Sequence, residues 1–521
     1  MKTPSPALPL SLAAKLGLLG TAALVGLPIL GLGLAWAYPV GLIDAPPIHT
    51  DRLVEATSNT VMLALLVTVF ALVLGSLFAW IQVRWTFPGS ALLTRLSVLP
   101  LVLPSFLLAA TLREGLAPLG SLGELLGRQE RFDGFGATVF VLVLSCTPYV
   151  QLVVSAALKR LPRHTEEAAQ SLGASPSRIV REIVLPALRP ALGFAALLVL
   201  VYAAADFGAV AVMDTQVLTY ELYQFAGRGG VQAPLIGGLL IVAISPLVIL
   251  GRRLGGDYGS SELSYVRSGH TAGQRPALWV QTIGTALLGT YLVFALVLPL
   301  MLITRWGVLI PAQGPLIGPL ITTAVVGVTA GLATLVLGGF PAALVAQSKG
   351  KRGALETLTF VASGVPGVMI GFGLLQLALR VPQGSLRSFA EGGAILLLGL
   401  ALRFASHSYA ALKPALLTQS EQSIEAARLL GASRWRVWRQ VRGPHLAPAL
   451  ASGFLLSFVA VVKELPITLM LIPAGHTTLA TRIFDAHEDA HLGDLGVAAL
   501  SLLGMVLVAQ ALLWRWSRHE R

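Results

Sequence analysis

The sequence predicts an all-α polytopic membrane protein with about 12 transmembrane helices, arranged as two parallel six-helix repeats. Apolar residues make up 55% of the 521 residues and charged residues only 12%. Apolar runs of about 18 residues or more recur along the whole chain, and each is long enough to cross a bilayer as a helix. A polar segment near residue 167 returns near residue 425, which indicates an internal duplication.

The spans fall into two sets of six. Because an even number of spans separates the copies, both halves enter the membrane from the same side, as parallel repeats do. A polar stretch at 252–276 is typical of a flexible linker, expected on the cytoplasmic side. It divides a first half, 1–251, from a second half, 277–521. The expected spans lie near 16–38, 59–83, 93–112, 137–158, 187–212, 232–251, 277–304, 319–346, 355–379, 392–412, 445–472 and 493–514.

Basic residues indicate the orientation. With the N-terminus inside, the inward segments carry 26 of the 37 Lys and Arg residues, the outward segments nine, and the spans two. This excess predicts cytoplasmic N- and C-termini. It also explains the net charge of +12 without nucleic-acid binding. Cys146, the only cysteine, lies in an apolar run and is expected to be a small core residue.

The duplicated polar segments, 163–190 and 421–448, are here called island 1 and island 2. Each holds roughly 25 residues between spans, more than a simple connection needs. A glycine interrupts each island, which indicates a bend or a close backbone contact. One hypothesis is amphipathic helices held on anionic lipid; the other, favoured by the matching glutamates, glycines and prolines, is a docking element for a two-fold partner. The arginines available to lipid are Arg178, Arg181, Arg434, Arg436 and Arg439.

The islands resemble the EAA loop of ABC importer permeases. The pattern is E-A-A, three residues, G, nine residues, then I-x-L-P, and island 1 matches it in full, including Ile183 and Leu185. Island 2 departs from it at Val441 and Gly443. The resemblance implies that each loop docks in a cleft of an ATPase subunit. The implied coupling residues are Glu167, Ala168, Ala169, Gly173, Pro186, Glu425, Ala426, Ala427, Gly431 and Pro444.

This resemblance implies a type I ABC importer permease in a bacterial inner membrane. The expected partners are two copies of a cytoplasmic ABC ATPase, a periplasmic substrate-binding protein and membrane lipid. No cofactor is expected on this chain, since ATP and Mg would bind the ATPase. A single chain with two fused six-helix halves is similar to the ferric-iron permeases and to the thiamine permeases. The stretches 202–210 and 463–485 resemble segments of the ferric-iron group. Ferric iron is therefore the expected substrate; thiamine, phosphonate, sulfate and polyamines stay open.

Asp206 and Glu464 form a further matched pair, each 20 residues beyond the island proline. That is about 30 Å of helix, near the outer end of the span. In a structural role, each carboxylate reaches the membrane interface or pairs with a neighbour, as Lys463 could with Glu464. In a functional role, the two carboxylates form an acidic pair at the outer mouth, where a binding protein docks or a cation enters.

Two other segments are candidates for the pathway. The segment 363–367 is expected to kink or break a helix. A metal site is considered for the loop 485–494, but its spacing matches no strong ligand motif, so solvated surface is expected and no metal ligand is assigned. Its acidic and histidine residues are Asp485, His487, Glu488, Asp489, His491 and Asp494.

Other function classes lack their signatures. The chain has no G-x-x-x-x-G-K-[ST] phosphate loop, so it is not expected to hydrolyse ATP. No G-x-S-x-G or H-E-x-x-H motif indicates an enzyme. A secondary transporter is the alternative class, but it would need ionisable groups near mid-membrane, where Arg403 is the main exception among nearly charge-free spans.

Overall fold

A computed structural model places most of residues 12–518. The structure does not describe residues 39–42, 45–48, 256–276, 348–358 and 360–363. Single loop positions are also not described, at 87, 119, 121, 122, 126, 128, 383, 385, 386 and 389. Most of the predicted linker therefore lies outside the described residues. Apart from one parallel pair of two-residue strands, β1 (Ile43–Asp44) and β2 (Arg228–Gly229), the regular structure described is helical, which confirms the all-α class.

Where its residues are described, each predicted span coincides with a helix or with consecutive helices; 355–358 and 360–363 of the span 355–379 lie outside the described residues. Among the described residues, eight helices are long and apolar enough to cross a membrane, and the pair 90–102 and 105–115, bent by 96°, makes a ninth. Three shorter apolar helices, 26–37, 232–246 and 367–380, account for the remaining predicted spans. About twelve membrane helices therefore fit the chain.

The helices of the first half are α1 (Leu12–Ala37), α2 (Thr50–Arg84), α3 (Ser90–Leu96), the 3-10 turn η1 (Leu99–Val102), α4 (Ser105–Gly115), α5 (Gly134–Arg160), α8 (Leu185–Ala205) and α11 (Gln232–Gly255). Those of the second half are α12 (Leu278–Leu292), the π-helical turn η3 (Val293–Val297), α13 (Leu298–Leu309), α14 (Ile317–Gln347), α16 (Gly367–Arg380), α18 (Ile395–Leu417), α21 (Gly443–Val462) and α24 (Leu492–Arg518).

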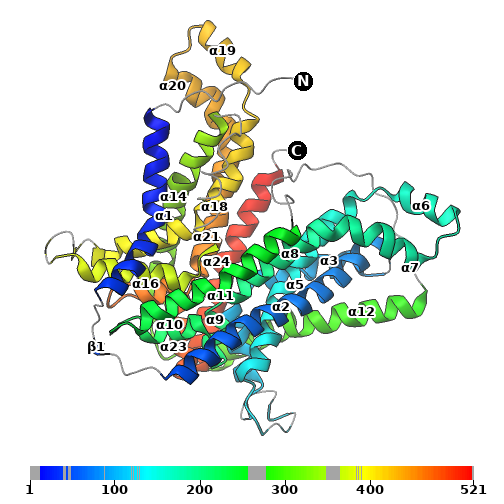
Figure 1. Ribbon diagram of the computed structural model, residues 1–521, viewed down its shortest axis with the longest axis horizontal. Helices are drawn as coiled ribbons and strands as arrows, with labels where there is room; N and C mark the ends of the chain where they lie inside the picture. The colour runs from blue at the N-terminus through cyan, green and yellow to red at the C-terminus, as the bar shows by residue number, and fades with distance from the viewer. Residues whose placement is uncertain are drawn as a thin grey trace.

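These helices form two arms that diverge from a common junction (Figure 1). One arm contains α2, α5 and α8, and the other contains α14, α18 and α21. The junction holds α16 and the short helices α9 (Gly208–Val212), α10 (Leu218–Phe225) and α23 (Leu479–Glu488). The islands lie at the far ends of the arms, as α6 (Arg163–Ser171) with α7 (Pro176–Ile179), and as α19 (Glu421–Leu429) with α20 (Arg434–Val437).

The duplication predicted from the sequence has a counterpart in the packing. Gly75 and Gly338 end the same Leu-Val-Leu-Gly motif on α2 and α14. A Cβ atom on either glycine would overlap the backbone of the facing helix, at Thr147 on α5 and at Ala405 on α18. Small residues let membrane helices approach this closely. Thr147 and Ala405 have the same offset as the islands, so the two arms are built by the same contact.

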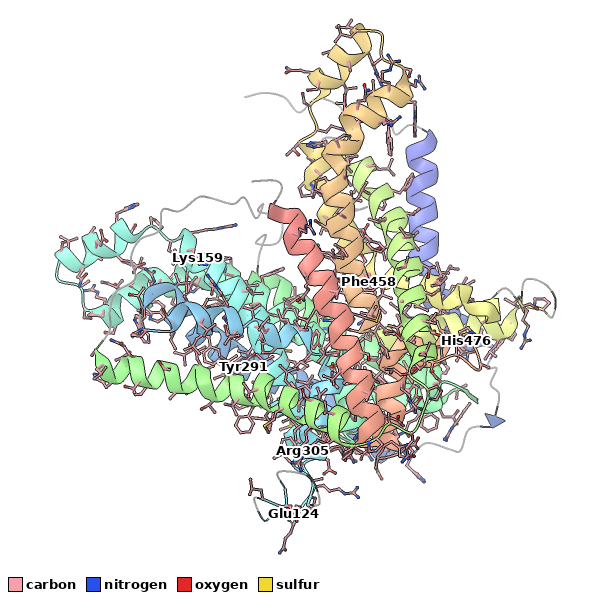
Figure 2. The ribbon with its side chains drawn as sticks, turned by 180° about the vertical axis from the view of Figure 1, so that it is seen from behind. Glu124, Lys159, Tyr291, Arg305, Phe458 and His476 are labelled. Carbon is pink, nitrogen blue, oxygen red and sulfur yellow. The ribbon has the colours of Figure 1, made fainter. Side chains whose placement is uncertain are left out.

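The first helix of each half also packs on the other half. The backbones of α1 and α16 touch at Gly31 and Gly373, where neither position has room for a Cβ atom. In the second half, the hydroxyl of Tyr291 on α12 donates a hydrogen bond of 3.1 Å to the carbonyl of Leu144 on α5. Seen from behind, α12 with Tyr291 runs along the first arm, while Phe458 lies on the second arm (Figure 2). The two halves are therefore interlocked.

Candidate functional site

The two islands share one local structure. In island 1, Gly173 follows the end of α6 with φ +82°, and α7 is followed by the π-helical turn η2 (Val180–Val184) and then α8. In island 2, Gly431 follows the end of α19 with φ +79°, and α20 is followed by the π-helical turn η5 (Trp438–Arg442) and then α21. The order of elements is the same in both islands.

The glycine of each island provides a left-handed turn. The amide of Gly173 donates to the carbonyl of Gln170 (2.9 Å), and that of Ala174 to the carbonyl of Ala169 (3.0 Å). The same two bonds recur at Gly431 and Ala432, which identifies a glycine-terminated helix end in both copies. A Cβ atom at either glycine would meet nothing within 4 Å. Of the two explanations offered by the sequence, the bend is therefore correct.

The residues around each turn give the islands a common exposed surface. Glu167 and Glu425 are exposed. The leucine before each glycine is almost fully exposed, 88% for Leu172 and 88% for Leu430. The two islands therefore expose an apolar side chain at the same repeated position. The island prolines Pro186 and Pro444 stand in the first turn of α8 and α21.

The islands also differ. Glu166 of island 1 forms a 2.5 Å ion pair with Arg84, at the end of α2, which ties the island to its arm. The equivalent residue of island 2, Ile424, is buried instead. Island 2 alone carries two stacked tryptophans, Trp435 and Trp438, with ring centroids 5.6 Å apart. The sequence shows these residue differences, but the contact of Glu166 with Arg84 joins residues 82 positions apart and could not be predicted from the repeat.

Asp206 and Glu464 lie at the other ends of α8 and α21, inside the protein. Asp206 is 9% exposed, and its Oδ1 accepts a 2.8 Å hydrogen bond from the amide of Ala209 at the start of α9. Glu464 is 6% exposed and accepts from the amides of Ile467 (3.0 Å) and Thr468 (3.1 Å) in α22 (Pro466–Leu471). Each carboxylate therefore caps the short helix that follows its span.

A broken helix faces each carboxylate. Pro104 and Pro366 precede α4 and α16, which confirms the break expected at 363–367, although 363 itself lies outside the described residues. The hydroxyl of Ser105, first in α4, donates a 2.6 Å hydrogen bond to Oδ2 of Asp206. A Cβ atom at Gly367, first in α16, would lie 2.8 Å from Oε1 of Glu464.

Two basic side chains complete the junction. The guanidinium of Arg403 on α18 donates a 2.8 Å hydrogen bond to the carbonyl of Val365, and its Nη1 would lie 3.2 Å from a Cβ atom added at Gly367. Lys463 does not pair with Glu464; its ammonium donates to the carbonyl of Leu101 in η1, across the two halves, at 3.1 Å. Sequence reasoning noted Arg403 as a charge within an apolar span, but nothing in the sequence indicated the partner of Lys463.

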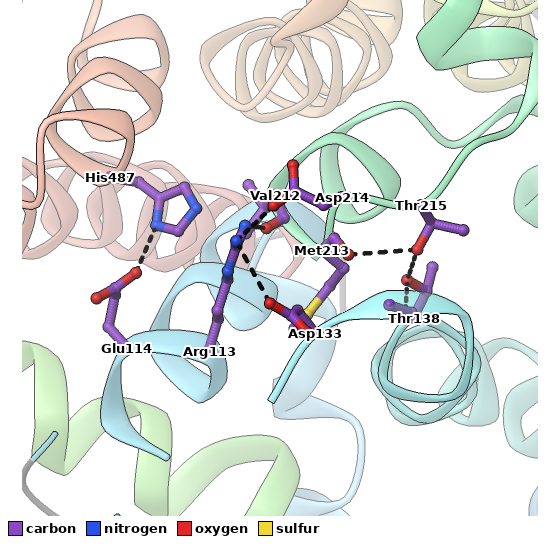
Figure 3. A network of polar contacts seen from close by, with 10 residues as sticks. Arg113, Glu114, Asp133, Thr138, Val212, Met213, Asp214, Thr215 and His487 are labelled. Atoms are coloured by element: carbon purple, nitrogen blue, oxygen red, sulfur yellow. Dashed lines mark hydrogen bonds and ion pairs between the residues drawn. The ribbon is translucent and has the colours of Figure 1, made fainter. Parts of the chain in front are cut away.

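Two of the acidic and histidine side chains of 485–494, those of His487 and Asp494, form structural contacts, whereas Glu488, Asp489 and His491 are exposed, as expected of solvated surface. Figure 3 shows His487 of α23 directed at Glu114 of α4, with Nδ1 and Oε1 3.1 Å apart, beside a network around Arg113. Asp494 forms a 2.9 Å ion pair with Arg482. Burial raises the pKa of Asp485, and Arg482 offsets part of this rise. The described residues hold no group of three or more His, Cys, Asp or Glu side chains arranged to bind a metal.

The comparison with known protein families accounts for both halves. The family model for the binding-protein-dependent transport system inner membrane component matches residues 71–254 and again 334–514. The chain belongs to this family. The two matches contain the two islands and both buried carboxylates, and they establish a fused pair of permease units with the type I permease fold.

Individual relatives are transport permeases. An Fe(3+)-transport system permease protein of Haemophilus influenzae is 25% identical over 468 residues, 87% of this chain and 88% of its own length. A ferric transport system permease protein of Actinobacillus pleuropneumoniae is 25% identical over 498 residues, 89% of this chain and 71% of its own length. A sulfate transport system permease protein of Escherichia coli is 32% identical over 180 residues, 34% of this chain and 63% of its own length. This chain is thus a multi-pass membrane permease subunit.

Proposed function

We propose that this chain is the membrane-spanning subunit of an ATP-driven ferric-iron importer in a bacterial inner membrane. Its two halves form the substrate pathway between them. Two copies of a separate ATPase bind the islands from the cytoplasm, where both termini also lie, and a periplasmic binding protein delivers the substrate from the opposite side. ATP and Mg bind the ATPase and not this chain.

The local structure that the two islands share is the main support for this proposal. Each island exposes a leucine beside a left-handed glycine, and each continues through a π-helical turn into one long helix. That helix, α8 or α21, ends at the buried carboxylate of the junction. A push on the island is therefore transmitted along a rigid helix to the point where the halves meet, which is the geometry that a coupling element requires.

Two equal docking surfaces on one chain call for a partner present twice. A symmetric ATPase dimer presents the same patch two times, so it fits two islands of the same structure. Glu167 and Glu425 are exposed on the same islands and supply polar groups for the proposed contact. Island 1 and island 2 differ in the tryptophans of island 2, so their affinities for the two ATPase copies are expected to differ.

The substrate assignment is supported by the relatives that span both halves. The two ferric permeases match 87% and 89% of this chain, whereas the sulfate permease matches 34%. The sulfate permease is nevertheless more similar over the part that it matches, at 32% identity. Sulfate is therefore the second candidate substrate.

Replacing Gly173 tests the coupling role. Valine is β-branched and costs about 1–2 kcal/mol in the left-handed region, whereas asparagine visits that region readily. The chain is purified with its ATPase, reconstituted in proteoliposomes, and supplied with iron-loaded binding protein. Gly173→Val is expected to reduce iron uptake at least about tenfold per ATP hydrolysed, and Gly173→Asn to retain most of it. Glu167→Ala is expected to uncouple in the same way.

Capture of the binding protein by the chain serves as the internal control, because it takes place at the other end of the molecule. It should be equal in the three variants. If Gly173→Val and Glu167→Ala both import iron at the normal rate per ATP, the islands do not couple the ATPase. Uptake of sulfate but not iron by the unchanged chain would retain the coupling role and replace the substrate.

A further inference from the structure

The segments that lead from each island into its long helix differ in charge, although their backbones match. They are residues 176–184, here called neck 1, and residues 434–442, here called neck 2. Neck 1 contains two arginines and one glutamate, and its Arg178 forms a 3.0 Å ion pair with Glu182. Neck 2 contains no acidic residue and four arginines: Arg434, Arg436, Arg439 and Arg442. Positive charge is therefore concentrated on one neck only.

The protein does not compensate the charge of neck 2. Three of its arginines, Arg434, Arg436 and Arg439, are exposed at the far end of the second arm (Figure 1). The Nε of Arg442 is buried and has no hydrogen-bond acceptor among the described residues. No ion pair joins any of the four guanidinium groups to a described carboxylate. They are therefore available to an anion outside the chain.

Two tryptophans lie on the outer side of neck 2. Trp435 and Trp438 are 68% and 50% exposed, and their rings are stacked with an interplanar angle of 8°. Val437, between them, is only 3% exposed, so it marks the side of the neck that packs against the protein. Arg439 follows Trp435 by four residues, which places it on the same helical side as the tryptophans. The outer side of neck 2 therefore combines aromatic rings with positive charge.

Neck 2 begins a helix that is longer than the hydrocarbon core of a bilayer. The continuous helix Arg434–Val462 has 29 residues. By the rise of an α-helix it is about 43 Å long. Because the hydrocarbon core is about 30 Å thick, about 13 Å of this helix lies outside it. That length corresponds to about nine residues, which is the extent of neck 2 when the apolar remainder fills the core. Neck 2 therefore lies at the level of the lipid headgroups, where tryptophan is enriched in membrane proteins.

We propose that neck 2 binds anionic phospholipid headgroups of the cytoplasmic leaflet. Its guanidinium groups match the headgroup phosphates, and its indole rings lie between the headgroups and the acyl chains. Island 1 is tied to its own arm by the ion pair of Glu166 with Arg84, whereas island 2 has Ile424 at the equivalent position and lacks that tie. Lipid holds island 2 in its place. The exposed Leu430 lies outside neck 2, so the island keeps a separate surface for the ATPase.

Quenching of tryptophan fluorescence by brominated lipid tests this contact. The full chain, alone and with its ATPase, is placed in nanodiscs of phosphatidylcholine that contain a minor fraction of brominated phosphatidylglycerol or, in parallel, of brominated phosphatidylcholine. The chain has nine tryptophans. The contribution of neck 2 is therefore the difference between the unchanged chain and the double variant Trp435→Ser, Trp438→Val. These changes give neck 2 the residues that neck 1 has at the equivalent positions, Ser177 and Val180.

Phosphatidylglycerol is expected to quench the tryptophans of neck 2 at a mole fraction about tenfold lower than phosphatidylcholine, because several arginines attract the anionic lipid. High salt should reduce this preference by screening the charges. The triple variant Arg434→Gln, Arg436→Gln, Arg439→Gln should lose the preference but keep the quenching by phosphatidylcholine, which shows that the tryptophans still reach the bilayer. The double variant Arg178→Gln, Arg181→Gln of neck 1 is the matched control and should keep the full preference.

Three results would overturn the lipid contact. Equal quenching by the two lipids would show that the arginines do not select anionic headgroups, and no quenching by either lipid would place the tryptophans away from the bilayer. Quenching that disappears when the ATPase binds would assign neck 2 to the ATPase contact instead. The import function is tested separately by uptake, so it stands under each of these results. A chain that fails to import iron but shows the phosphatidylglycerol preference would keep the lipid contact.

Discussion

At the scale of single residues, the two buried carboxylates show how a duplicated site diverges without losing its geometry. Asp206 faces Ser105, and the longer Glu464 faces Gly367 at the equivalent place. The extra methylene of glutamate takes the space that the serine side chain fills in the other half. The pairs are therefore complementary in size, and a change in one residue requires a change in its partner.

The swap Asp206→Glu tests this complementarity. With Ser105 present, the longer carboxylate overpacks the site, and the free energy of unfolding should fall by about 1–3 kcal/mol. Ser105→Gly in the same chain should restore most of the loss. Thermal unfolding in detergent of the two single variants and the double variant measures this coupling. Additive losses in the double variant would show that the two positions are independent.

Sequence analysis located part of this site. The shared offset brought Asp206 and Glu464 together as a pair, because a repeat aligns residues without any knowledge of the fold. It did not locate the contact of Lys463 with Leu101, which joins residues 362 positions apart and depends on how the halves meet. The capping role of the carboxylates was likewise missed, since α9 and α22 are too short to give a periodic signal.

At the scale of secondary-structure elements, the contact between α1 and α16 joins the two halves through backbone. Gly31 and Gly373 meet where no side chain fits. Membrane helices associate by such close packing, because lipid provides little hydrophobic drive between them. A larger residue at either glycine separates the helices along their whole contact.

Gly31→Leu is therefore expected to lower the thermal stability of the chain and to expose α1 to protease. Gly33→Leu is the matched control, because Gly33 lies two residues further on the same helix, and a Cβ atom there would meet nothing within 4 Å. Thermal melts and limited proteolysis in detergent compare the two variants. Equal melting temperatures would show that the glycine contact does not hold α1 to the second half.

The elements themselves were largely predictable from the apolar runs, since a run long enough to span lipid must be helical. The break at Pro366 was predicted as a break or kink, but the 96° bend at Pro104 was not, because a proline indicates a break without its angle. The π-helical turns after the islands have no sequence signal that we recognise. They recur at equivalent positions, so the repeat preserves them.

At the scale of the whole molecule, the interlocking of the halves is the feature that sequence analysis could not provide. An apolar run predicts a span but not the partner against which it packs. The structure shows α1 on α16 and α12 on α5, so each half contributes a helix to the other. The islands lie at the free ends of the arms (Figure 1), so we expect the arms to move there, with the junction as the pivot.

This arrangement predicts how ATP changes the molecule. Spin labels on cysteines replacing Leu92 on α3 and Leu417 on α18, which are 61% and 45% exposed, report the separation of the two arms. The native Cys146 is fully buried and should not react. When the ATPase binds a non-hydrolysable ATP analogue, the distance measured by pulsed electron resonance is expected to shorten, because closure of the ATPase dimer draws the islands together.

A second labelled pair makes this prediction specific to rotation of the arms. Leu92 and Leu185 both belong to the first arm, and Leu185 is 47% exposed. Their distance should stay constant if the arm moves as a rigid body about the junction. Shortening within this pair would mean that the arm bends, and an unchanged distance between the arms during active uptake would contradict the pivot. In Gly173→Val the shortening should diminish along with uptake, because the proposed coupling requires the turn at Gly173 both to bind the ATPase and to move the arm.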